Sequence, residues 1–143
     1  MGRLVDRELR RAAVEALGAL ARSADYRDRA DAGHALAAFA ELPEAHGPLL
    51  ELVLDPGDTY ATRVTAGALL RRRDRLGLTA VASALTVAGP NHGDWIQTAV
   101  LDVFGVFSDE RDDAIRLCGE LSQDPDARVA RELRDLLAGI HPS

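Results

Sequence analysis

The sequence predicts an all-α protein: a single domain, residues 1–143, of antiparallel helix pairs stacked into a short solenoid. Two observations lead to this class. Apolar residues recur at helical spacing along the chain, and turn dipeptides recur at a fixed interval. The turns Asp55-Pro56, Gly89-Pro90 and Asp124-Pro125 lie 34 and then 35 residues apart. Sequence periods of about 20–50 residues indicate solenoids, and those near the middle of this range indicate repeated helical hairpins.

Two further sets of residues share this period. Aromatic residues occur at Tyr26, Tyr60 and Trp95, again 34 and 35 residues apart, and glycines occur at Gly33 and Gly67. Each aromatic residue follows an Asp or Thr that suits a helix N-cap; these are Asp25, Thr59 and Asp94. We therefore expect the same kind of helix start in three successive units.

Apolar stripes and end signals define the expected helices. Leu78, Val81, Ala82 and Leu85 follow the i, i+3, i+4, i+7 spacing of one helix face. Pro43 suits a first helical turn, whereas Pro48 is expected to delay the helix start or to kink the helix. Sustained period-two alternation, the signal for strands, does not occur. The predicted helices cover residues 3–22, 26–41, 44–54, 59–72, 75–88, 94–107, 109–123 and 126–139.

These features resemble the HEAT-like (armadillo-type) helical repeats. The run Asp124-Pro125-Asp126-Ala127-Arg128-Val129-Ala130 is similar to the D-P-x-x-x-V-A start of such repeats, and Asp55-Pro56 with Arg63-Val64 is a looser copy. The tetratricopeptide pattern shares the period, but its Trp, Leu-Gly and Tyr positions are not met. The resemblance implies a right-handed α-α superhelix of about three to four hairpins, roughly eight helices, with the second helices lining the concave face. It specifies a fold, not a function.

Composition narrows the function classes. The 17 basic and 23 acidic residues give a net charge of −6, which argues against nucleic acid as a partner. All basic residues are Arg, a bias typical of GC-rich coding and hence of a bacterial source. Cys118 is the single cysteine, so no intrachain disulfide is expected. The chain shows neither a membrane-spanning apolar run nor a signal-peptide core, so we expect a cytoplasmic protein.

Motifs that carry known chemistry do not occur. The sequence has no HExxH, no phosphate-binding Gly-rich loop and no GxSxG. The acids from Asp109 to Asp113 lack the Gly and terminal Glu of a calcium loop, and a helix N-terminus explains them. The histidines lack metal-ligand spacing and are expected on the surface or in loops; they are His34, His46, His92 and His141. We expect no catalytic residue, metal or cofactor.

Two segments are candidates for a binding surface. Arg71-Arg72-Arg73-Asp74-Arg75 is the one basic concentration, and it either stabilises a helix C-terminus or grips a carboxylate or phosphate of a partner. Residues 76–93 contain no charged side chain, so this segment is either deeply buried or part of an interface. The candidate concave-face residues are Glu51, Arg72, Arg75, Thr79, Ser83, Arg116 and Glu120.

The function expected from these features is non-enzymatic: a scaffold that holds a partner protein or peptide on the concave face. An immunity-, antitoxin- or adaptor-like protein is one version. The first alternative is an enzyme or a ligand- or nucleic-acid-binding protein of the same fold, glycosylase-like or lyase-like. It needs convergent carboxylates or Arg in a concave cleft with an aromatic wall, and finding Arg72, Arg75 and Trp95 on one concave surface would support it. The second alternative is a self-associating scaffold or part of a longer array, with segment 76–93 as the interface.

Overall fold

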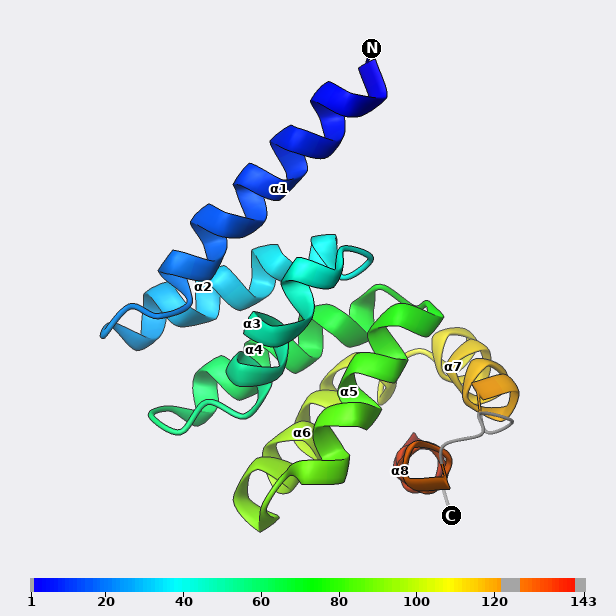
Figure 1. Ribbon diagram of the computed structural model, residues 1–143. Helices are drawn as coiled ribbons and strands as arrows, with labels where there is room; N and C mark the ends of the chain where they lie inside the picture. The colour runs from blue at the N-terminus through cyan, green and yellow to red at the C-terminus, as the bar shows by residue number, and fades with distance from the viewer. Residues whose placement is uncertain (1, 122–126, 141–143) are drawn as a thin grey trace.

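The computed structural model describes residues 2–121 and 127–140, and within these residues the protein is entirely helical, without strands (Figure 1). The described elements are α1 (Gly2–Leu20), α2 (Tyr26–Leu36), the 3-10 helix η1 (Ala37–Phe39), α3 (Pro43–Val53), α4 (Thr59–Arg71), α5 (Arg75–Val87), α6 (Pro90–Phe104), α7 (Ser108–Leu121) and α8 (Ala127–Ile140). The predicted all-α class is confirmed, with eight α-helices in the described ranges. The third predicted repeat start, Asp124-Pro125-Asp126, lies outside these ranges.

Side-chain caps explain where α2 and α4 begin. The carboxylate of Asp25 accepts the backbone N–H of Arg27 at 2.9 Å, and that of Asp58 accepts the N–H of Tyr60 at 2.7 Å. These bonds satisfy N–H groups that have no partner inside the helix. The prediction of Asp25 as a cap is confirmed. The prediction of Thr59 is wrong by one residue, because the longer reach of the Asp58 carboxylate closes the same turn.

Proline decides the start of α6. The predicted cap Asp94 lies inside α6, where its backbone carbonyl accepts the Thr98 hydroxyl at 3.1 Å. The helix begins at Pro90 instead, after Gly89. Proline fixes a helical φ and lacks an N–H that a first turn would leave unpaired, so it starts a helix without a side-chain cap. Proline acts the same way in α3, which begins at Pro43 and contains Pro48. Of the two outcomes expected for Pro48, a late start or a kink, the late start does not occur.

The helices pack in consecutive pairs whose members contact the pairs before and after them. α4 is the central helix: it packs against α2 and α6 on two sides and also against α3 and α5. α1 lies across α2 and α3 at one end, and α8 contacts α5, α6 and α7 at the other (Figure 1). α3 and α5 also contact each other, although their first residues, Pro43 and Arg75, lie 32 positions apart in the chain.

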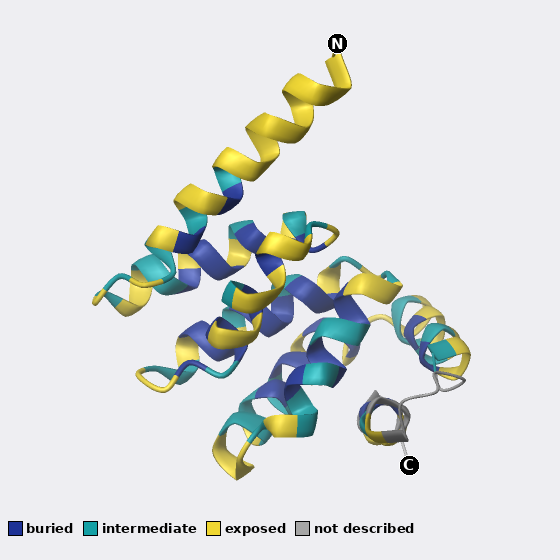
Figure 2. Ribbon diagram, viewed as in Figure 1, coloured by how far each residue is buried: buried dark blue, intermediate teal, exposed yellow. Residues whose placement is uncertain are grey.

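One contiguous cluster of buried side chains joins the helices. Its members are mostly Ala, Leu and Val, with Phe104 as its fully buried aromatic side chain. Burial follows the centre of the stack, in α4 and the inner sides of α3, α5 and α6 (Figure 2). The chain has few aromatic side chains, so small aliphatic residues fill most of the core. Because these residues are small, neighbouring helices can approach each other closely.

Two of the repeated landmarks meet in space. The rings of Tyr26 and Tyr60, at the starts of α2 and α4, pack edge to face with centroids 6.0 Å apart. Farther along the same helices, Gly33 lies directly against Thr65. The equivalence of the α2 and α4 starts, predicted from their 34-residue spacing, therefore corresponds to a side-by-side contact of the two helices.

Candidate binding groove

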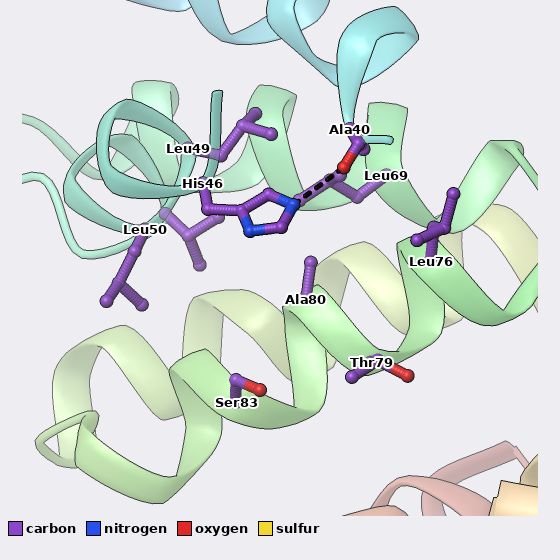
Figure 3. Close-up of a pocket in the computed structure, with 10 residues that line it drawn as sticks. Ala40, His46, Leu49, Leu50, Leu69, Leu76, Thr79, Ala80 and Ser83 are labelled. Atoms are coloured by element: carbon purple, nitrogen blue, oxygen red, sulfur yellow. Dashed lines mark hydrogen bonds between the residues drawn. The ribbon is translucent and has the colours of Figure 1, made fainter. Parts of the chain in front are cut away.

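An apolar groove of about 240 Å³ opens between α3 and α5 (Figure 3). α3 contributes one wall and α5 the other, while residues of α4 and of the turn before α3 close the base and one end. The lining residues are Ala40, His46, Leu49, Leu50, Val53, Leu69, Leu76, Thr79, Ala80 and Ser83. Aliphatic side chains dominate this lining, and it contains no Asp, Glu, Lys or Arg.

Small side chains keep the groove open. Ala80 of α5 points towards the ring of His46 on α3, so the space between the two walls remains unfilled (Figure 3). At the mouth, Leu50 and Leu76 are 40% and 42% exposed, whereas Leu49 deeper in the wall is buried. The groove thus presents exposed leucines at its rim and an apolar floor, an arrangement suited to apolar side chains from outside.

His46 is held in place by one hydrogen bond. Its Nε2 lies 2.8 Å from the carbonyl oxygen of Ala40. A carbonyl oxygen can only accept, so Nε2 carries the hydrogen and donates. This bond fixes the orientation of the ring at the groove wall (Figure 3).

Hydroxyl groups supply the remaining side-chain polarity. Thr79 and Ser83 lie one turn apart on α5 and both line the groove. Together with His46 they give three polar side chains around an apolar floor. Such a lining can orient a bound group, but it lacks a pair of titratable side chains for general acid–base chemistry.

Of the seven residues predicted for the binding surface, Thr79 and Ser83 line this groove. Glu51 is exposed on α3 outside the lining. Arg75 of α5 and Glu120 of α7 form an ion pair with each other at 3.0 Å, and Arg116 pairs with Asp113 within α7 at 2.9 Å. The structure thus brings Thr79 together with Ser83 and Arg75 together with Glu120, but it does not gather the seven predicted residues at one site.

Arg72 links several elements of the fold. Its Nη1 donates to the carbonyl oxygen of Ala37 in η1 at 2.7 Å, and its guanidinium pairs with Asp74 at 3.0 Å and with Glu41 at 3.6 Å. The neighbouring Arg73 pairs with Glu110 of α7 at 3.0 Å. Within the Arg71–Arg75 cluster, three arginines therefore bind acids of this same chain, which accounts for their positions without a partner.

The three residues of the enzyme alternative lie apart. Arg72 and Arg75 flank the turn between α4 and α5, whereas Trp95 is near the start of α6, beyond the other end of α5. Since α5 has 13 residues, its two ends are about 20 Å apart. This separation places the arginines and the indole at opposite ends of the helix pair.

Sequence reasoning missed His46, Leu50 and Leu76. His46 was expected on the surface or in a loop, and it is exposed on α3, but its place in the groove wall was not foreseen. The leucines were not singled out. The available signal was the spacing Leu76, Thr79, Ala80, Ser83, which puts four residues on one face of α5.

Within the described ranges, no three His, Cys, Asp or Glu side chains gather as metal ligands would. Over the same ranges, no helix has both the length and the apolarity needed to cross a bilayer.

Compared with known proteins, the chain matches no protein-family model and no curated protein sequence.

Proposed function

We propose that the chain is a protein-interaction module, a short HEAT-like solenoid whose α3–α5 groove binds the apolar face of an amphipathic helix from another protein. The observation that carries the proposal is the preformed groove itself, with its leucine rim, uncharged lining and fixed histidine. Helix-in-groove recognition uses anchors at i, i+3, i+4 and i+7 that insert into a surface of this type.

The size of the groove favours inserted side chains over a free small molecule. Pockets for drug-sized ligands usually measure about 300–1,000 Å³, and this groove measures about 240 Å³. It accommodates one or two anchor side chains of a segment that continues across the rim. Leu50 and Leu76, exposed on opposite walls, supply the apolar surface on which such a segment rests.

Charge defines the flanks of the partner helix. Glu51 is exposed on α3 beside the rim residue Leu50, and the chain carries a net charge of −6. A partner with Arg or Lys beside its apolar anchors is attracted over long range by the net negative charge of this chain, and this attraction raises the rate of association. We therefore assign the partner as an amphipathic helix with basic flanks, and nucleic acid as the less suited partner.

The repeat architecture supports the solenoid part of the proposal. α2, α4 and α6 pack successively, and α3 and α5 lie side by side as second helices of adjacent hairpins. In solenoids of this type the second helices line the concave face, where extended partners bind. A buried, unpaired Cys118 is consistent with the cytoplasm as the compartment of the protein.

The test compares two phenylalanine variants on the same helix. Ala80→Phe fills the groove between α5 and His46, whereas Val87→Phe places the same ring at the exposed end of α5, outside the lining. Each tagged protein is used to capture partners from a host lysate, and the captured partner is then purified and titrated by calorimetry.

We expect a partner that binds wild type and Val87→Phe equally and loses at least tenfold affinity for Ala80→Phe. A synthetic peptide of its amphipathic helix should compete. A partner that binds Ala80→Phe as tightly as wild type would place the interface elsewhere. Recovery of nucleic acid alone would overturn the proposal.

A further inference from the structure

The two hydroxyl side chains that line the groove are not used by the fold. Among the described residues, neither the Thr79 nor the Ser83 hydroxyl has a hydrogen-bond partner. Other helical hydroxyls of this protein bond back to their own backbone. That of Thr86 donates to the Ser83 carbonyl at 2.6 Å, and that of Thr98 donates to the Asp94 carbonyl at 3.1 Å. Thr79 and Ser83 therefore keep both a donor and an acceptor for a group from outside the chain.

The two hydroxyls form a row beside an apolar row of the same helix. Thr79 and Ser83 are four positions apart and so lie one turn apart on one face of α5. Leu76 and Ala80 have the same spacing, and both line the groove as well. In Figure 3, Ala80 points towards His46, and the two hydroxyl side chains lie together on one side of α5. This wall of the groove thus offers an apolar row and, next to it, a hydroxyl row.

A segment bound across the rim would remove water from the hydroxyl row. Thr79 and Ser83 are already half-buried in the free protein. A polar group that loses its water and gains no hydrogen bond weakens binding by about tenfold. A helix that carried only aliphatic anchors would leave both hydroxyls in this state, so a well-matched partner supplies a polar side chain at this point.

The absence of charge in the lining narrows the choice of that side chain. A carboxylate or an ammonium group would enter a lining without Asp, Glu, Lys or Arg, where no counter-charge offsets its desolvation. Arg75, one turn before Thr79, lies outside the lining and is paired with Glu120 at 3.0 Å. The matching group is therefore neutral.

A carboxamide fits the two hydroxyls best. It has one acceptor oxygen and two N–H donors, and each hydroxyl can both donate and accept. Side chains four positions apart on a helix are separated by about 5–6 Å at their Cβ atoms. One Asn or Gln side chain can then accept from one hydroxyl and donate to the other.

We infer that Thr79 and Ser83 select the partner helix through an Asn or Gln that lies beside its aliphatic anchors and hydrogen-bonds to both hydroxyls. This inference rests on the proposed function, because it names a feature of the helix that the groove binds. The aliphatic lining supplies affinity, whereas the hydroxyl row rejects helices that lack the carboxamide. A single buried Asn fixes the register of coiled coils in the same way.

Peptide selection tests the inference without a known partner. A phage library of helical peptides about 18 residues long, with the positions of one face randomised, is selected on wild type and counter-selected on Ala80→Phe. The selected peptides should be enriched in Asn or Gln at one position of the apolar face. One such peptide and its counterpart with Leu at that position are then titrated by calorimetry.

Three proteins are compared with the two peptides. Wild type should bind the carboxamide peptide about tenfold more tightly than the Leu peptide. The double variant Thr79→Val/Ser83→Ala should lose or reverse this preference and still bind the Leu peptide. Thr86→Val is the matched control: it removes a hydroxyl from the same helix outside the lining, and it should keep the wild-type preference. Circular dichroism checks that all three proteins fold alike.

The outcomes separate this inference from the proposed function. Peptides that depend on Ala80 but show no enrichment of Asn or Gln would overturn the inference and leave the groove as a binding site. A double variant that keeps the wild-type preference would overturn it too. If no selected peptide distinguishes wild type from Ala80→Phe, the proposed function itself fails, and the inference fails with it.

Discussion

Arg29 of α2 holds the carboxylate of Asp55, just after α3, in a two-pronged ion pair: Nε lies 3.0 Å from Oδ1 and Nη2 lies 3.1 Å from Oδ2. The side chains are only 14% and 7% exposed. Oδ2 of Asp55 also accepts the N–H of Asp58 at 2.8 Å, and the Asp55 carbonyl accepts Nε2–H of His92 at 2.8 Å. The aspartate of the repeated Asp-Pro turn therefore joins α2, the start of α4 and the start of α6.

Breaking this pair should destabilise the fold strongly. Asp55→Asn leaves the Arg29 guanidinium largely buried without its counter-charge, and removing one partner of a buried pair costs about 3–5 kcal/mol. The matched control is Asp102→Asn, which breaks the similar but more exposed pair of Arg63 and Asp102, 2.7 Å apart. Exposed pairs contribute little to stability, because water and salt screen the two charges. Urea unfolding measures both, and equal losses would refute the role of Asp55.

The two repeated glycines should respond in opposite ways to alanine. A Cβ at Gly33 would overlap Thr65 Oγ1 and lie 2.9 Å from Thr65 Cβ, so Gly33→Ala should separate α2 from α4. Overpacking of this kind costs about 1–3 kcal/mol. A Cβ at Gly67 would meet the flexible end of Arg71 at 3.0 Å. Gly67→Ala should therefore gain up to about 1 kcal/mol from helix propensity. Thermal unfolding distinguishes the two, and a Gly33→Ala protein as stable as wild type would contradict the close contact.

Two buried hydroxyls offer a way to stabilise the protein. Thr62 and Thr65 of α4 are fully buried, and neither Oγ1 has a hydrogen-bond partner among the described residues. Thr62→Val keeps the shape and removes the desolvated hydroxyl, so the free energy of unfolding should rise by about 1 kcal/mol. Thr98→Val is the control, since its Oγ1 donates to the Asp94 carbonyl and should bring no gain. No increase for Thr62→Val in urea unfolding would count against an unsatisfied hydroxyl.

Cys118 should report unfolding through its reactivity. Burial in α7 raises the pKa of its thiol to about 11, because the thiolate is poorly solvated there. Because the thiol pKa is higher in the folded state than in the unfolded state, protonated Cys118 stabilises the folded state below the unfolded-state pKa. This contribution to stability is lost as pH rises from about 9 towards 11. We expect negligible alkylation of the native protein at pH 8 and rapid alkylation in urea. Between pH 9 and 11, wild type should lose more stability than Cys118→Ala. Fast native alkylation would contradict the burial of the thiol.

The sequence by itself determined the helical class, the order of the helices and most of their ends. These properties depend on residues a few positions apart in the chain. The signals are apolar residues spaced three and four positions apart, an Asp just before the first turn of a helix, and a proline within that first turn. Errors arose where two such signals competed, as at Pro90 and Asp94, because either residue can start a helix and only packing selects one. The 34-residue spacing of Tyr26 and Tyr60 also anticipated a contact between two helices.

Only the tertiary structure decided which distant side chains meet. Arg72 and Arg75 looked like one basic cluster along the chain, but their partners come from two other parts of the fold: Glu41 from the turn before α3, and Glu120 from α7. The groove depends on α3 and α5 lying next to each other and on Ala80 facing His46, a relation that no local spacing contains. Helix formation is set within a few turns of the chain, whereas a binding surface is set by how whole helices are placed by the core between them.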